Sequence, residues 1–193
     1  MKRVVLVNGV PASGKSALAA RLLPYLHAEG LAAVPFALDT VKEALFDHVG
    51  TGDRDHNRML GRASYQAIFD TIAAFPDDLV PVIDAWHGFQ PDTVLRDHLA
   101  RAGVARVIEL WCDIPPETAA VRYRARSAVR RPGHPPASYA DELLELARCA
   151  CPVSLGPVVR ARGDGPPDDP APLRAVADLL RTGGPTNPEG GEM

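Results

Sequence analysis

Eight residues near the start of the chain have the types and the spacing that bind phosphate. Residues 9–16 read GVPASGKS and fit the phosphate-binding loop pattern G-x-x-x-x-G-K-[ST]. In such a loop, backbone N–H groups and the positive end of the following helix surround a phosphate. Lys15 can reach the β- and γ-phosphates, and the Ser16 hydroxyl can bind Mg²⁺. The pattern therefore predicts a nucleoside triphosphate site with ATP and Mg²⁺ as cofactors.

The segments that flank this loop supply the context it requires. Residues 3–8 form a β-branched run typical of a buried parallel strand, and residues 17–23 have the apolar spacing of a helix. The alternative, a glycine turn before an ordinary helix, does not account for this combination of strand, loop and helix. The residues that the pattern assigns to the nucleotide are Gly9, Pro11, Ala12, Ser13, Gly14, Lys15, Ser16 and Ala17.

Two aspartates follow predicted strands, at the sheet edge where ligands of such folds bind. Asp39 ends the run 33–38, and we predict that it is the general base, because a carboxylate near a γ-phosphate can take the proton of an attacking hydroxyl. An N-cap for a helix beginning near Thr40 is the alternative, and Asp39 could do both. Lys42, one turn later, could contact substrate or phosphate, or lie in solvent.

Asp84 ends the run 79–84 and has two functional interpretations. It could hold a Mg²⁺-bound water together with Ser16, or it could hydrogen-bond the phosphate acceptor; capping of a loop is the simpler alternative. Trp86 and His87 follow directly, and aromatic side chains beside polar groups are typical of a small-molecule cleft. We therefore predict that Asp84, Trp86 and His87, with Asp39 and Lys42, contact the acceptor, although Trp86 could instead belong to the core.

Three arginines recur at intervals of four residues and would share one helical face. They are Arg122, Arg126 and Arg130, and the segment PGHPP at residues 132–136 follows. We predict a lid at about residues 122–137, with Arg126 and Arg130 acting on the transferred phosphate beside Lys15 and Asp39, and Arg122 binding the nucleotide. The alternative is a surface face that pairs with Glu117 and other acids.

Strands and helices alternate along the chain, which predicts right-handed βαβ crossovers and a parallel sheet. The expected fold is an α/β three-layer sandwich of the P-loop NTPase type, with a five-stranded sheet, helices on both faces and the Arg-rich lid, similar to nucleoside monophosphate kinases. One domain is expected at residues 1–181, followed by a disordered tail at 182–193. The remaining strands are expected at 104–112 and 158–161, and the helices at 15–29, 40–49, 56–75, 91–102, 115–127, 139–150 and 173–181.

These motifs resemble a family of small P-loop kinases that includes chloramphenicol phosphotransferase, zeta toxins and polynucleotide kinases. The resemblance spans residues 3 to about 181 and rests on the phosphate loop, DTVK at 39–42, Asp84 and the arginine-rich segment at 122–134. It implies phosphate transfer to a hydroxyl, with Asp39 as the base. Other nucleotide-binding classes fit less well: no N-K-x-D follows for guanine, and Ala85 stands where motor ATPases usually have a glutamate.

Composition narrows the possible partners. The formal net charge of −3 provides no broad basic field, which disfavours nucleic acid as a partner. No segment resembles a signal peptide or a membrane span, and the three cysteines lack zinc-site spacing, so we expect a cytoplasmic protein without a structural metal. Residue patterns leave the oligomeric state open.

The expected acceptor is a hydroxylated small molecule such as a sugar, an aminosugar or an antibiotic. Acidic residues at 43, 47, 53 and 55 favour a neutral or cationic compound, unless they face solvent. Two other functions remain open. One is a polynucleotide or tRNA kinase, and the other is a nucleotide-binding regulator without transfer activity.

Overall fold

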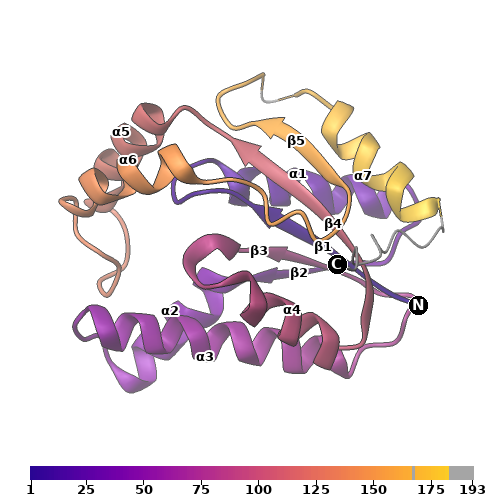
Figure 1. Ribbon diagram of the computed structural model, residues 1–193, viewed down its shortest axis with the longest axis horizontal. Coiled ribbons are helices and arrows are strands. Elements are labelled where there is room, and N and C mark those ends of the chain that lie inside the picture. Colours follow the sequence, from indigo (N-terminus) through magenta and orange to yellow (C-terminus); the bar gives the residue numbers. More distant parts are fainter. Residues whose placement is uncertain (167, 183–193) are drawn as a thin grey trace, which may run out of the picture.

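The computed structural model describes residues 1–166 and 168–182, and one parallel sheet forms its centre (Figure 1). The strand order is β2-β3-β1-β4-β5, and each pairing is parallel. The predicted α/β fold with a five-stranded parallel sheet is therefore confirmed. The strands are β1 (Lys2–Asn8), β2 (Ala33–Ala37), β3 (Val80–Asp84), β4 (Val104–Asp113) and β5 (Val158–Arg162).

Helices cover both faces of this sheet, as predicted. Side chains alternate along β1, so Val5 and Val7 pack with α1 and α7 on one face, while Leu6 packs with α3 and α4 on the other. The described helices are α1 (Lys15–Ala28), α2 (Leu38–Val49), α3 (Arg54–Ala73), α4 (Asp92–Arg101), α5 (Pro116–Ser127), α6 (Tyr139–Cys149) and α7 (Ala171–Arg181), with a 3-10 turn η1 at His87–Phe89.

Two prolines inside these elements are tolerated. Helix α1 continues through Pro24, without ending there. Pro81 lies in the interior strand β3, in register with Val34 of β2, and the ladder with β1 begins one residue later, at Val82. Of the tail expected at residues 182–193, only Thr182 lies within the described part of the chain.

The carboxyl ends of the strands all point to one side of the molecule, the left in Figure 1. There α5 and α6 lie above the sheet edge and α2 lies below it. Residues of α5 and α6, among them Tyr123 and Leu143, pack against Val10 and Ala12 of the phosphate loop. The edge that receives ligands in such folds is thus enclosed from two sides.

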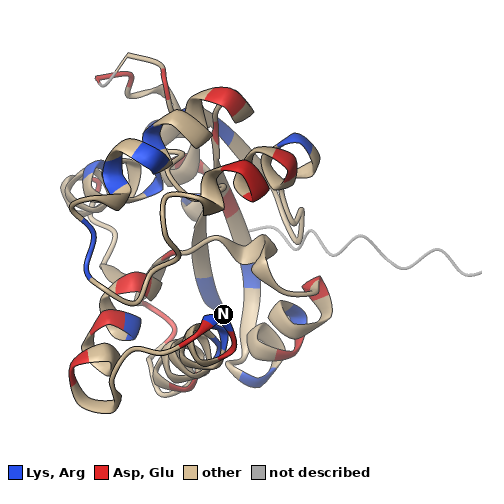
Figure 2. Ribbon diagram, turned by 90° about the vertical axis from the view of Figure 1, so that its left-hand side faces the viewer, with Lys and Arg blue, Asp and Glu red and all other residues tan. Residues whose placement is uncertain are grey.

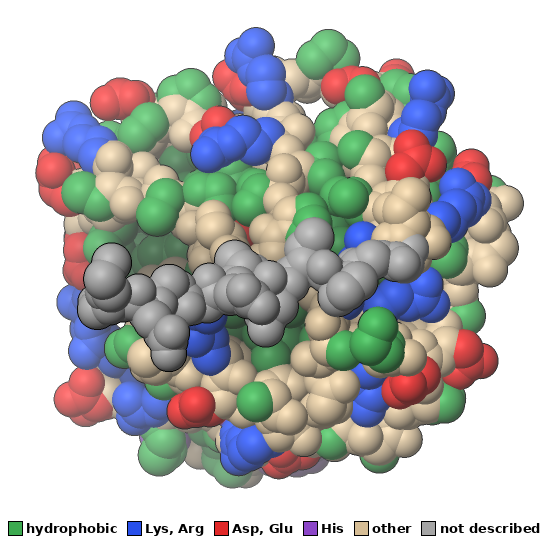
Figure 3. Space-filling view, turned by 45° about the vertical axis from the view of Figure 1, so that its right-hand side comes forward, with side chains coloured by type: hydrophobic (Ala, Val, Ile, Leu, Met, Phe, Trp, Pro, Cys, Tyr) green, Lys and Arg blue, Asp and Glu red, His purple; other side chains and the backbone are tan. Residues whose placement is uncertain are grey.

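The remaining surface has a mixed character. On the face of the molecule shown in Figure 3, acidic and basic side chains are interspersed. Within the described residues, no helix has the length and apolar content needed to cross a membrane.

Candidate active site

The phosphate loop joins β1 to α1 in a conformation that depends on glycine. Gly14, which precedes the first turn of α1, has φ +105°, a backbone angle that side chains disfavour. At Gly9, a Cβ would lie 2.8 Å from the carbonyl oxygen of Cys112 on β4. The loop therefore packs directly against the neighbouring strand. The first N–H groups of α1, which have no partner within the helix, point toward the phosphate position.

A buried network supports this loop from beneath. The Asn8 amide donates to Glu109 Oε1 at 2.7 Å, and Asn8 Oδ1 accepts the backbone N–H groups of Gly9 at 2.8 Å and His87 at 3.0 Å. Glu109 also accepts the N–H groups of Val153 at 3.1 Å and Ser154 at 2.8 Å. Asn8 and Glu109 are fully buried. Sequence reasoning did not assign a role to Glu109, although one carboxylate inside the apolar run VIELWC is a signal.

A cleft of about 500 Å³ opens at the carboxyl ends of the strands. It brings together most of the predicted site, from four separate segments of the chain. Four predicted residues do not line it: Gly9, Ser13 and His87 are buried, and Arg122 is bonded to Gly163. The predicted residues that do line it are Pro11, Ala12, Gly14, Lys15, Ser16, Ala17, Asp39, Lys42, Asp84, Trp86, Arg126 and Arg130.

Lys15, Ser16 and Asp84 meet at the base of the cleft. Burial raises the pKa of Asp84, while Lys15 and a hydrogen bond from the Ser16 hydroxyl act in the opposite direction. Burial lowers the pKa of Lys15, and the carboxylates of Asp84 and Asp39 counteract that shift. Ser16 and Asp84 offer two neighbouring oxygen ligands, a donor set that suits Mg²⁺, which completes its shell with water and phosphate.

Asp39 lies in the first turn of α2 and points to the lid. Helix α2 begins at Leu38 with Ala37 as its N-cap, so Asp39 is not the cap that the sequence offered as an alternative. Its Oδ2 accepts a hydrogen bond from the Arg130 guanidinium at 2.6 Å. Burial lowers the pKa of Arg126 and Arg130 acts in the same direction, while the carboxylates of Asp39 and Asp84 oppose the shift.

Further contacts tie the lid to the helices below the sheet edge. Arg131 donates to both carboxylate oxygens of Asp47 at 2.7 and 2.8 Å, and the His134 imidazole lies 2.7 Å from Glu43. Figure 2, which faces this edge, shows basic and acidic segments both above and below it. The segment predicted as a lid therefore lies against α2, and its opening and closing stay a prediction.

A second group of possible metal ligands lies beside the lid. Oxygen and nitrogen atoms of Asp39, Glu43 and His134 are within 4.8 Å of one another. Asp39 is already paired with Arg130, and Glu43 with His134. Burial lowers the pKa of His134, although its bond to Glu43 acts in the opposite direction. These pairs account for the closeness of the three side chains, as part of the contact between the lid and α2.

With this geometry established, comparison with known proteins identifies the family. Residues 4–147 match the family model AAA_33, described as an AAA domain. The chain belongs to the AAA_33 family. The match includes the phosphate loop, Asp39, Asp84 and the lid, and it confirms the predicted relationship to P-loop proteins of kinase-like type.

Two solved structures were also found to be similar to this AAA_33 chain. A proposed kinase from Chloroflexus aurantiacus is similar with a TM-score of 0.75 and 25% sequence identity, over 93% of this chain and 97% of that one. The protein APE1195 matches with a TM-score of 0.49 and 19% identity, over 77% of this chain and 96% of its own. Among curated proteins, none matches significantly. The fold and the family together support nucleotide binding of the P-loop kinase type.

His87 has a structural position in this AAA_33 protein, which corrects its prediction as a substrate residue. Its side chain is 1% exposed and its Nδ1 lies 2.7 Å from the Tyr65 hydroxyl. Burial lowers its pKa to about 3, and Lys15 contributes in the same direction. The turn η1 directs His87 inward, whereas its neighbours Trp86 and Gly88 line the cleft.

Arg122 does not line the cleft, and its predicted contact with the nucleotide stays a prediction. Its guanidinium donates to the carbonyl oxygen of Gly163 at 2.9 Å, in the loop after β5. That loop packs against the phosphate loop, because a Cβ at Gly163 would lie 2.0 Å from the Ser13 carbonyl oxygen. Arg122 therefore braces the loop after β5 and is not part of the cleft.

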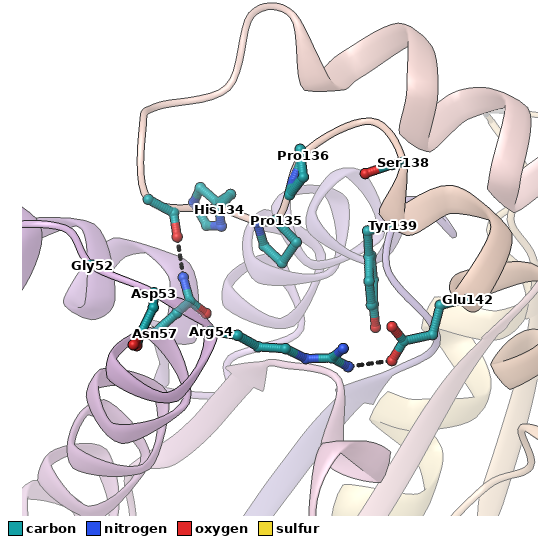
Figure 4. A pocket seen from close by; sticks show the side chains of 11 residues that line it. Gly52, Asp53, Arg54, Asn57, His134, Pro135, Pro136, Ser138, Tyr139 and Glu142 are labelled. Atoms are coloured by element: carbon teal, nitrogen blue, oxygen red, sulfur yellow. Dashed lines mark hydrogen bonds and ion pairs between the residues drawn. The ribbon is translucent and has the colours of Figure 1, made fainter.

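Helix α3 contributes cleft residues that sequence reasoning missed. Arg54, Asn57, Arg58 and Gly61 all line the cleft. Figure 4 shows Arg54 paired with Glu142 of α6 across a side chamber of about 440 Å³, and the Asn57 amide bound to the Gly133 carbonyl oxygen. A signal was present: positions 54, 58 and 61 continue the spacing of the buried stripe at 65, 68 and 72, but carry polar residues or glycine.

The four acidic residues that favoured a neutral or cationic acceptor, at positions 43, 47, 53 and 55, do not line the cleft. Asp47 pairs with Arg131, and Asp53 caps α3 by accepting the His56 N–H at 2.9 Å. Asp55 is exposed, and Glu43 is bonded to His134. Of these four carboxylates, Asp53 lines only the side chamber and the others do not line the cleft. The predicted charge preference therefore loses its support.

Proposed function

We propose that this protein is an ATP-dependent phosphotransferase that moves the γ-phosphate to a hydroxyl group of a small molecule. One observation carries the proposal: Asp39 lines the same cleft as Lys15 and Ser16, and it is paired with the lid residue Arg130. A candidate base, the phosphate loop and the positive charge of Arg130 thus share one cavity. Membership in a P-loop kinase-like family supports this chemistry.

Each of these residues has a role in the proposed reaction. Asp39 orients the acceptor hydroxyl and takes its proton as the oxygen attacks. Lys15, Arg126 and Arg130 stabilise the negative charge on the transferred phosphoryl group. Ser16 and Asp84 would hold Mg²⁺, which supplies further positive charge to the phosphates.

The shape of the cleft favours a small acceptor over nucleic acid. The Arg54–Glu142 pair joins α3 to α6, and Tyr139 and Leu146 of α6 close the cleft from above. A polynucleotide needs an open basic groove, often with aromatic stacking platforms. A nucleotide-binding regulator would not require Asp39 in the phosphate cleft.

The test is a mass-spectrometric screen with ATP, Mg²⁺ and pooled hydroxyl compounds, including sugars, aminosugars, antibiotics, nucleosides and a short RNA. We expect one class of small molecule to gain a phosphate with the wild-type protein and not with Lys15→Ala. Asp39→Asn should lower kcat by about 10²–10⁴-fold, because it removes the base. ATP binding, measured by calorimetry, should be retained in Asp39→Asn.

Asp47→Asn is the matched control, since Asp47 lies on the same helix and outside the cleft. It should keep most of the activity. Wild-type turnover by Asp39→Asn would remove Asp39 as the base. Phosphorylation of the RNA alone would favour the polynucleotide kinase, and ATP binding without any product would favour the regulator.

A further inference from the structure

The acceptor side of the cleft is more basic than the proposed chemistry requires. Six basic and three acidic side chains line the cleft. Lys15, Arg126 and Arg130 serve the transferred phosphate, and Asp39 and Asp84 serve the proton and the metal. Arg54 is neutralised by Glu142. Lys42 and Arg58 therefore remain without an assigned counter-ion from the cleft.

Arg58 has only a weak partner among the described residues. Its guanidinium lies 3.6 Å from Asp55, and their side chains are 57% and 89% exposed. Exposed pairs of this kind contribute little binding energy. Arg54, one turn earlier on the same face, contrasts with it because it reaches Glu142 on α6. Arg58 is thus available to an anion in the cleft.

Lys42 is a buried cation whose hydrogen bond goes to a neutral group. It is 9% exposed, and its Nζ donates to the Asn57 side-chain oxygen at 2.8 Å. Burial lowers its pKa, while Asp39 and Glu43 nearby raise it. A buried charge is stabilised most by a directly bonded opposite charge, which Asn57 does not provide.

Gly61 leaves room for a ligand next to these cations. It lies inside α3 three residues after Arg58, where glycine weakens a helix relative to alanine. A Cβ added there would meet no atom within 4 Å, and the residue lines the cleft. Gly61 is itself buried, and the helix backbone borders the cavity at this point without a side chain that fills it.

We propose that the acceptor carries an acidic group, a carboxylate or a phosphate, and that Arg58, with Lys42 in the same cleft, recognises this group while Asp39 faces the hydroxyl. This inference rests on the proposed function and deepens it. It replaces the neutral or cationic acceptor that the sequence favoured. A bidentate guanidinium contact would fix both the class and the orientation of the acceptor.

The test uses pairs of hydroxyl compounds that differ in the acidic group: glycerate with glycerol, and glucose 6-phosphate with glucose. Binding to the full chain is measured by calorimetry in the presence of Mg²⁺ and an ATP analogue that cannot transfer its γ-phosphate, which keeps the probes out of the phosphate loop. We expect the acidic member of a pair to bind about 10–100-fold more tightly. Arg58→Met should abolish this difference.

Arg62→Met is the matched control, because Arg62 lies on the same helix, is exposed and does not line the cleft. It should keep the preference for the acidic member. Equal affinity for both members of every pair, including no binding of either, would overturn the inference, as would an unchanged preference in Arg58→Met.

The outcomes also separate this inference from the proposed function. Phosphate transfer to a neutral acceptor at an unchanged rate in Arg58→Met would overturn the acidic acceptor and leave the phosphotransferase intact. An Arg58-dependent preference for acidic probes, with no transfer to any compound, would support the binding site and contradict the phosphotransferase.

Discussion

Buried contacts hold the part of the cleft around the phosphate loop, here called the phosphate half. The part between α2, α3 and the lid, the acceptor half, also depends on an exposed side-chain pair. Beneath the phosphate loop, Asn8 and Glu109 are fully buried and bonded to backbone groups of three segments. Across the acceptor half, Arg131 and Asp47 are paired while each is at least half exposed. Breaking the buried contacts costs more free energy than breaking the exposed pair.

We propose that this difference allows one cleft to bind two substrates, a nucleotide and a phosphate acceptor. A preorganised phosphate loop requires no rearrangement when the nucleotide arrives. We propose that the lid, in contrast, opens and closes around an acceptor, because one of its contacts with α2, the Arg131–Asp47 pair, is exposed and costs little to break. Arg130 connects the two halves, since it belongs to the lid and is bonded to Asp39.

Among the variants that test the contrast between the two halves, Arg126→Met is expected to have the largest effect, a decrease in kcat. Arg126 lines the cleft and is coupled to Arg130, Asp39 and Asp84. If it stabilises the transferred phosphoryl group, its loss should lower kcat by about 10³–10⁵-fold with little change in ATP affinity. Single-turnover kinetics with the acceptor found in the screen, together with calorimetric ATP titration, measure the two quantities.

Arg124→Met is the control for this experiment. Arg124 lies on the same helix but pairs with Asp141 on the outer surface. Its kcat should remain near that of the wild type. A similar loss in both variants would assign the effect to the stability of α5, and wild-type kcat in Arg126→Met would remove Arg126 from the reaction.

The sequence allowed prediction of the phosphate half because its signal is local. Strand, glycine loop, Lys15 and Ser16 are contiguous, and their spacing reflects a single piece of backbone geometry. The acceptor half arises from segments that meet only in the fold. Arg58 approaches the cleft because α3 packs under α2, and no short pattern encodes that packing.

His87 shows where a local interpretation fails. It follows Asp84 closely, which suggested a position in the cleft, but the unpredicted turn η1 directs it into the core. Its backbone N–H and its ring then join Asn8 and Tyr65. It is therefore part of the buried support of the phosphate half.

A pH experiment tests whether His87 belongs to this buried support, and its expected effect on the free energy of unfolding is intermediate among the predictions. Its pKa is about 3 in the folded protein, and about 6.5 is ordinary for an unfolded chain. As the pH falls below 6.5, the unfolded state binds a proton that the folded state does not, so stability decreases. The expected loss is about 1.4 kcal/mol per pH unit, or about 5 kcal/mol by pH 3.

Urea unfolding of the wild type and His87→Gln across this pH range measures the effect. Carboxyl groups titrate in both proteins, so the difference between their slopes isolates His87. We expect a shallower pH dependence in His87→Gln, whatever its stability at neutral pH. Parallel curves would show that His87 is protonated in the folded protein, contrary to its burial beside Tyr65.

The smallest effect is expected in the acceptor half, from Arg131→Met. The Arg131–Asp47 pair is exposed, so its loss should lower the free energy of unfolding by less than about 1 kcal/mol. Limited proteolysis at residues 130–137 should nevertheless accelerate, because this pair helps hold the lid on α2. Asp47→Asn should add little to Arg131→Met, since either change removes the same pair. A loss of several kcal/mol in Arg131→Met would mean that both halves are equally integral to the fold, and the contrast between a rigid phosphate half and an opening acceptor half would fail.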